Sequence, residues 1–190
     1  GFLAILRLGA RLLAYWPFDG SLAELGLGVP RGGINKGKSE FVEGPESGKA
    51  LVLSDGQFVT VEKTPELDSP AITVECFFKL TAQPACNACL VAKRGVEKTR
   101  FSIHVHPDLT QFLIWNGGAV IPASVPGAPM RVGEWHHLAV SLTAGGLGVY
   151  LDGVPCDIHG GGGLNPDAKK QPLRIGAARP DGSEPGTWAI

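Results

Sequence analysis

The 190-residue sequence has few charged residues, and neither sign predominates. Charged residues make up 18% of the chain, the formal net charge is −1, and no block of like charges occurs. A nucleic acid or an anionic membrane surface is therefore not an expected partner, because both attract concentrated positive charge. The sequence also lacks an apolar run of the roughly 18 residues that a membrane-spanning helix needs. We therefore expect no membrane insertion within the domain.

Patterns that carry hydrolytic or nucleotide chemistry are also missing. Retaining glycosidases need two carboxyl groups about 5 Å apart, which alternate positions on one strand face can supply. No strand that we predict contains such a pair, and no serine lies in a Gly-x-Ser-x-Gly turn. Residues 32–39 match the phosphate-loop pattern, but Pro45 follows before a helix could form. These observations predict that the protein is not an enzyme.

Glycine and proline, in contrast, are abundant. The chain has 27 glycines and 15 prolines, yet 44% of its residues are hydrophobic, which is enough apolar surface for a folded core. From residue 14 onward the apolar residues alternate with polar ones, most clearly over residues 71–80. Many short strands separated by glycine and proline turns indicate an all-β domain. We predict a two-sheet antiparallel β-sandwich of the jelly-roll kind.

Two Asp-Gly pairs and the first residues refine this prediction. Asp152-Gly153 and Asp55-Gly56 each separate two apolar runs, which predicts two β-hairpins. Residues 1–12 instead carry apolar residues at helical spacing. We interpret residues 1–12 as an upstream linker or helix remnant, either an amphipathic linker helix or a membrane anchor cut short, and residues 13–190 as the domain.

One tryptophan is a candidate for ligand binding. Trp115 lies at the end of a predicted strand beside Asn116. An aromatic ring next to an amide could stack on a sugar ring and hydrogen-bond to it. The other three tryptophans are expected to be part of the framework.

Histidines and cysteines provide further candidates. His104 and His106 share one face of a predicted strand and are additional ligand-binding candidates. Cys86 and Cys89 form a Cys-x-x-Cys motif, which is compatible with a redox pair, half of a zinc site, a loop disulfide or two free thiols. Together the four residues could form a Cys2His2 zinc site.

Seven short segments, in order, resemble the LamG-like members of the concanavalin A-like lectin/glucanase superfamily, which are related to laminin G and pentraxin modules. These segments are residues 13–20, 48–56, 72–79, 90–93, 133–140, 149–153 and 173–176. Cys76 departs from the pattern, since the family usually has a larger residue there. The resemblance covers residues 13–190.

The resemblance implies a non-catalytic jelly-roll module fused to other domains of an exported or surface protein, at the extracellular, periplasmic or cell-surface side. Its ligand would be a glycan or a protein, and the alternative role is that of a purely structural or adhesive spacer. Relatives often hold a structural calcium ion, for which Asp19 and Asp55 are the candidates here. The family's last strand should begin at residues 188–190, where the chain ends. We therefore expect a sandwich without its C-terminal strand and only weak calcium binding.

Overall fold

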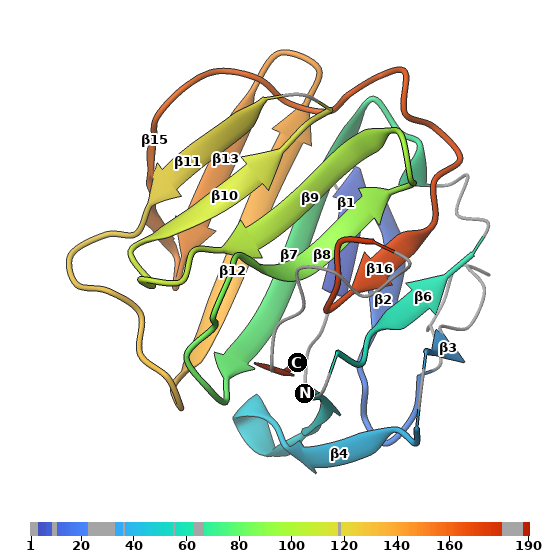
Figure 1. The fold of residues 1–190 in the computed structure, drawn as a ribbon, viewed down its shortest axis with the longest axis vertical. Helices are drawn as coiled ribbons and strands as arrows, with labels where there is room; N and C mark the ends of the chain where they lie inside the picture. The colour runs from blue at the N-terminus through green and yellow to red at the C-terminus, as the bar shows by residue number, and fades with distance from the viewer. Residues whose placement is uncertain are drawn as a thin grey trace.

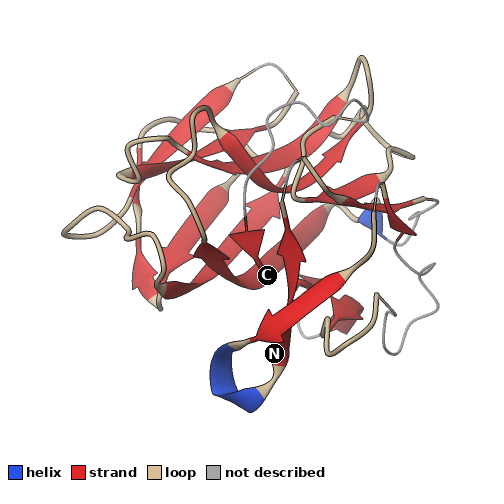
Figure 2. Cartoon of the chain, turned by 60° about the horizontal axis from the view of Figure 1, so that its bottom comes forward, coloured by secondary structure: helices blue, strands red, loops and turns tan. Residues whose placement is uncertain are grey.

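Two antiparallel β-sheets packed face to face make up the structure, a computed structural model (Figure 1). It describes residues 4–8, 11–22, 33–35, 37–54, 56–62, 67–117, 119–179 and 188–190. In this part of the chain nearly all regular structure is β-strand; a short 3-10 helix, η1 (Pro45–Ser47), is visible in Figure 2. The predicted two-sheet antiparallel β-sandwich is confirmed.

The first sheet has the central order β14-β13-β12-β7-β17-β5-β4, with β1 and β2 attached beside β7. Its strands are β1 (Ala4–Leu8), β2 (Arg11–Trp16), β4 (Glu40–Glu43), β5 (Lys49–Leu53), β7 (Ala71–Leu80), β12 (Trp135–Thr143), β13 (Leu147–Leu151), β14 (Val154–Pro155) and β17 (Trp188–Ala189). β7 and β12 are the longest strands and pair along their full length. They form the centre of this sheet.

The second sheet has the order β15-β11-β10-β9-β8-β16-β6-β3. Its strands are β3 (Gly33–Ile34), β6 (Val59–Val61), β8 (Ala88–Arg94), β9 (Thr99–Val105), β10 (Gln111–Trp115), β11 (Val120–Ser124), β15 (Asp157–Ile158) and β16 (Leu173–Ile175). The phosphate-loop look-alike contributes β3, an edge strand, and is not followed by a helix in its described residues. Gly33 therefore lies in a strand and Gly37 in a loop.

The core lies between the sheets and follows the predicted alternation. In β7 every second residue is buried, from Ile72 to Leu80. Phe78 of the first sheet meets Phe112 of the second edge to face, with ring centroids 6.2 Å apart. Cys76 packs in this core as a small hydrophobic side chain.

Only one of the two predicted hairpins forms. β13 and β14 pair across Asp152-Gly153, where both residues have positive φ (52° and 81°), as a tight hairpin turn requires. The Asp55-Gly56 hairpin is wrong, because β5 belongs to the first sheet and β6 to the second. Asp55 itself lies outside the described residues. The turn here connects two layers instead of two neighbours in one sheet.

The predicted N-terminal helix is also wrong. β1 and β2 form an antiparallel pair, and β1 pairs in addition with residues 73–75 of β7. The pairing with β7 provides hydrogen-bond partners for the backbone of this apolar segment. The spacing of apolar residues within the segment does not show such a contact with a distant strand. At the other end of the chain, β17 lies between β5 and β7, because it pairs with both.

One end of the sandwich is closed by a segment that follows the glycine tract at residues 160–163. The backbone N–H of Leu164 donates to the carbonyl of Thr143 in the first sheet (2.8 Å), and that of Asn165 donates to the carbonyl of Arg100 in the second (3.1 Å). A Cβ atom on Gly163 would lie 1.7 Å from the Thr143 oxygen, so only glycine fits this approach. The segment after the glycine tract thus ties the two sheets together.

Candidate functional site

Trp115 and His104 come together on the outer face of the second sheet. Ile114 and Ile103 point into the core, so their strand neighbours Trp115 and His104 point outward. Their ring centroids are 4.4 Å apart, with the planes tilted by 58°. Trp115 is partly exposed, whereas the side chain of His104 is fully buried. The structure therefore places His104 beneath the tryptophan and leaves the indole as the surface group.

The environment of His104 keeps its imidazole neutral. Burial lowers the pKa of His104 to about 3, and its Nε2 lies 3.0 Å from the Ser102 hydroxyl. A neutral ring in a hydrogen bond holds one orientation without the cost of a buried charge. His104 therefore acts as a support that orients Trp115, with no surface of its own for a ligand.

Asn116, the second predicted ligand-binding residue, packs against the glycine tract. Its backbone N–H donates to the carbonyl of Ala119 (3.3 Å), which closes a turn after β10. A Cβ atom on Gly162 would lie 2.4 Å from the Asn116 amide nitrogen, so the glycine permits this approach. We define the tryptophan site as Trp115, Asn116 and the supporting His104, bordered by Gly162. The sequence indicated the pair but not its glycine neighbour.

His106 does not belong to the tryptophan site. It follows the far end of β9, where its Nδ1 lies 2.7 Å from the Oδ1 of Asp108. The backbone N–H and hydroxyl of Thr110 also donate to Asp108 and lower its pKa to about 2. His106 is thus part of a turn between β9 and β10.

The residues considered for metal binding form no metal site within the described part of the chain. Asp19 is exposed after β2, and Asp55 is outside the described residues. Across the described residues no three His, Cys, Asp or Glu side chains form a group that could hold a metal ion. Of the four cysteines, Cys86 is exposed, whereas Cys76, Cys89 and Cys156 are buried.

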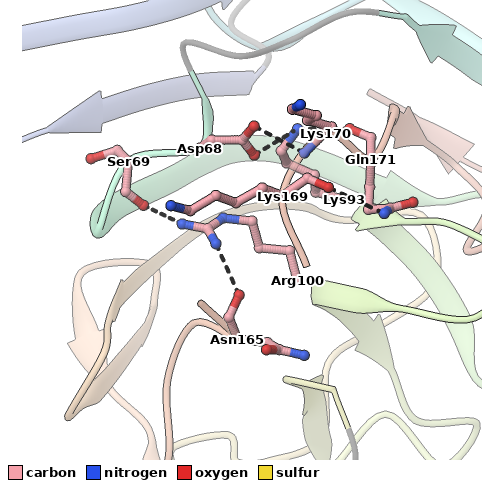
Figure 3. A network of polar contacts seen from close by, with 8 residues as sticks. All are labelled: Asp68, Ser69, Lys93, Arg100, Asn165, Lys169, Lys170 and Gln171. Atoms are coloured by element: carbon pink, nitrogen blue, oxygen red, sulfur yellow. Dashed lines mark hydrogen bonds and ion pairs between the residues drawn. The ribbon is translucent and has the colours of Figure 1, made fainter. Parts of the chain in front are cut away.

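A buried charged network, which the sequence analysis missed, lies at the same end of the sandwich as the glycine tract (Figure 3). The ammonium group of Lys93 is fully buried, 3.3 Å from the carboxylate of Asp68 and 2.6 Å from the carbonyl of Gln171. Arg100, only 1% exposed, donates to the carbonyls of Ser69 and Asn165, the latter at 2.9 Å. The one sequence feature that could have indicated this network is Lys93, which directly follows the apolar run of residues 90–92.

The network has the geometry of a structural clamp. The backbone N–H of Lys170 donates to the second carboxylate oxygen of Asp68 (2.9 Å), so both oxygens are used. Its partners come from three separate segments, around residues 68, 93–100 and 165–171. The contacts hold these segments together beneath the tryptophan end of the domain, and we assign the network no ligand.

With the fold and these sites described, the chain can be compared with known proteins. By architecture the domain is an antiparallel jelly-roll β-sandwich. Residues 53–188 match the family described as the concanavalin A-like lectin/glucanases superfamily, and the chain belongs to this family. A comparison with curated proteins finds no match.

Solved structures share the fold at low identity. Domain 4 of AbnA, an extracellular arabinanase from Geobacillus stearothermophilus solved with arabinotriose, is 19% identical, with a TM-score of 0.66 over 98% of this chain and 90% of that one. A sialidase from Trypanosoma rangeli, solved with the inhibitor DANA, is 15% identical, with a TM-score of 0.57 over 83% of this chain and 26% of the sialidase. In the described residues, no helix has the length and hydropathy to cross a membrane.

Proposed function

We propose that this domain is a non-catalytic recognition module that binds carbohydrate at the tryptophan site. The observation that carries the proposal is the partly exposed Trp115, held 4.4 Å from a buried and neutral His104. A preoriented indole loses little entropy when a sugar ring stacks on it. Asn116 adds an amide that can donate and accept hydrogen bonds next to the ring.

Membership of a superfamily that contains lectins supports this function. The arabinanase domain was solved with arabinotriose, which makes that trisaccharide a rational first probe. We further propose that the domain works outside the cell or at its surface, fused to other domains of a larger protein. Calcium, bound weakly near Asp19 and Asp55, remains part of the proposal.

The test is a glycan array followed by calorimetric titration of the best binder, with arabinotriose included. Trp115→Ala should weaken binding about fivefold or more, because a stacked aromatic ring contributes on the order of 1 kcal/mol or more. Trp135→Ala is the matched control: Trp135 is also partly buried but lies on the outer face of the other sheet, where it contacts Lys79. This control should keep wild-type affinity.

Three results would overturn the proposal. Equal affinities for wild type and Trp115→Ala would place the glycan elsewhere. An array without any binder would favour the second role, a structural or adhesive spacer, or a protein ligand. Release of products from any glycan in the array would contradict the non-catalytic assignment.

A further inference from the structure

A cavity lies at the opposite end of the sandwich from the tryptophan site. It has a volume of about 330 Å³ and is bordered by the loop before β12 and the β13–β14 hairpin. Pro129, Met130, Leu151 and Val154 supply apolar walls, and His136 and Asp152 supply polar groups. This volume and this mixture are typical of small-ligand pockets, which are mostly apolar with a few placed polar groups.

His136 is held in one orientation at this cavity. It lies on the same face of β12 as the core residue Leu138, and its ring centroid is 5.7 Å from that of Phe78. Only 11% of its side chain is exposed. Its Nε2 is buried and has no hydrogen-bond partner among the described residues. A buried ring nitrogen without a partner is costly, so it marks a place where a ligand group would be favoured.

Asp152 determines what His136 can recognise. Its Oδ2 lies 2.8 Å from the Nδ1 of His136, while its Oδ1 accepts the backbone N–H of His137 at 2.7 Å. The carboxylate is fixed by its position in the hairpin turn, where φ is +52°. A proton on Nδ1 that is donated to Asp152 leaves Nε2 as an acceptor in the neutral ring. The favoured ligand group is therefore a hydrogen-bond donor such as a hydroxyl.

The charges around the cavity argue against an anionic ligand. Arg131 at the rim is paired with Glu134 (3.3 Å), and Asp152 adds a further negative charge. A metal ion would need more ligands than this cavity offers, since no group of three metal-binding side chains occurs in the described chain. A neutral, polyhydroxylated ligand with one apolar face fits the lining best.

We infer that this cavity is a second carbohydrate subsite, which takes a terminal sugar residue by a hydroxyl donated to the Nε2 of His136. The inference rests on the proposed function and deepens it. The tryptophan site would stack on a glycan from the outer face of the second sheet. The cavity would enclose one sugar residue at the far end of the domain.

The test follows the imidazole nitrogens of His136 by NMR during titration with arabinotriose and, separately, with the methyl glycosides of arabinose, galactose and glucose. At least one probe at millimolar concentration should shift the Nε2 resonance in a saturable way. The shift should persist in Trp115→Ala, which removes only the other site.

A matched pair of variants tests where the probe binds. Val154→Trp places a bulky ring at the cavity rim, and it should weaken the His136 response at least about tenfold. Val154 is 48% exposed on an edge strand of the first sheet, so the change leaves the core intact. Val42→Trp makes the same change at a residue that is 41% exposed on the opposite edge strand, and it should leave the response unchanged.

The outcomes separate this inference from the proposed function. No saturable shift of His136 with any probe, while a glycan binds at Trp115, would overturn the second subsite and leave the function standing. A response that survives Val154→Trp would also overturn it. A His136 shift in a protein whose glycan affinity is unchanged by Trp115→Ala would support the cavity and contradict the tryptophan site.

Discussion

The two ends of the sandwich are closed by different means. At the tryptophan end, buried charges and a glycine that touches backbone tie the segments together: Lys93 is fully buried against Asp68, and Gly163 lies against Thr143. At the cavity end the ion pair of Arg131 and Glu134 is exposed, and apolar side chains surround an open volume. The buried ion pair at the tryptophan end should therefore contribute much more to the free energy of unfolding than the exposed ion pair at the cavity end.

The largest effect is expected from breaking the buried pair. Asp68→Asn should lower the free energy of unfolding by about 3–5 kcal/mol, because it removes the carboxylate that balances the buried Lys93 charge. Glu134→Gln, at the exposed pair, should cost no more than about 1 kcal/mol. Urea denaturation of both variants measures the difference. Equal losses of unfolding free energy would show that the two ion pairs stabilise the protein to the same extent.

The pH dependence of stability tests the support under Trp115. The folded-state pKa of His104 is lowered to about 3 by burial, so the unfolded chain binds the proton first as the pH falls. The stability associated with the neutral ring is complete above about pH 6.5 and is lost toward pH 3, by up to about 1.4 kcal/mol per pH unit. The destabilisation caused by His104→Gln should therefore shrink between pH 7 and pH 4. A destabilisation that is independent of pH would contradict a buried neutral His104.

The glycine tract offers a comparison within one loop. Gly163→Ala should cost about 1–3 kcal/mol, because its Cβ would meet the Thr143 oxygen at 1.7 Å. Gly161→Ala has no atom within 4 Å of the new Cβ and should change the free energy of unfolding by less than about 0.5 kcal/mol. Thermal denaturation of the two variants measures both. Similar melting temperatures would mean that the segment does not clamp the sheets.

The smallest effect concerns the thiols. Cys86 is exposed, whereas burial raises the pKa of Cys76 to about 12 and that of Cys156 to about 11. Since the thiolate is the reactive form, one thiol per native chain should react rapidly with a disulfide reagent, and Cys86→Ser should abolish that reaction. Fast reaction of a second thiol would show that a buried cysteine becomes accessible in the native protein.

The parts of the fold that the sequence predicted were those decided by local pattern. The strand at residues 71–80 and the hairpin at Asp152-Gly153 depend on alternation and turn chemistry, and both are confirmed. The Asp55-Gly56 hairpin and the N-terminal helix failed, because sheet membership and pairing with β7 are decided by distant residues. Local pattern does not specify which sheet a strand joins.

The candidate sites also consist of one part that local sequence pattern indicates and another part that depends on contacts between distant residues. Trp115 and Asn116 are neighbours in the chain, so the pattern could suggest them together. The contacts of Asp68 with Lys93 and of His136 with Asp152 join residues 25 and 16 positions apart, across strands and layers. Such pairs become visible only once the register of the strands is known.

The most direct test of the central claim is the indole N–H resonance of Trp115 during titration with the best-binding glycan, with Trp135 as the internal reference. We predict a saturable shift of Trp115 and an unchanged Trp135, since these rings lie on the outer faces of opposite sheets. A glycan that binds and leaves the Trp115 resonance in place would contradict the account.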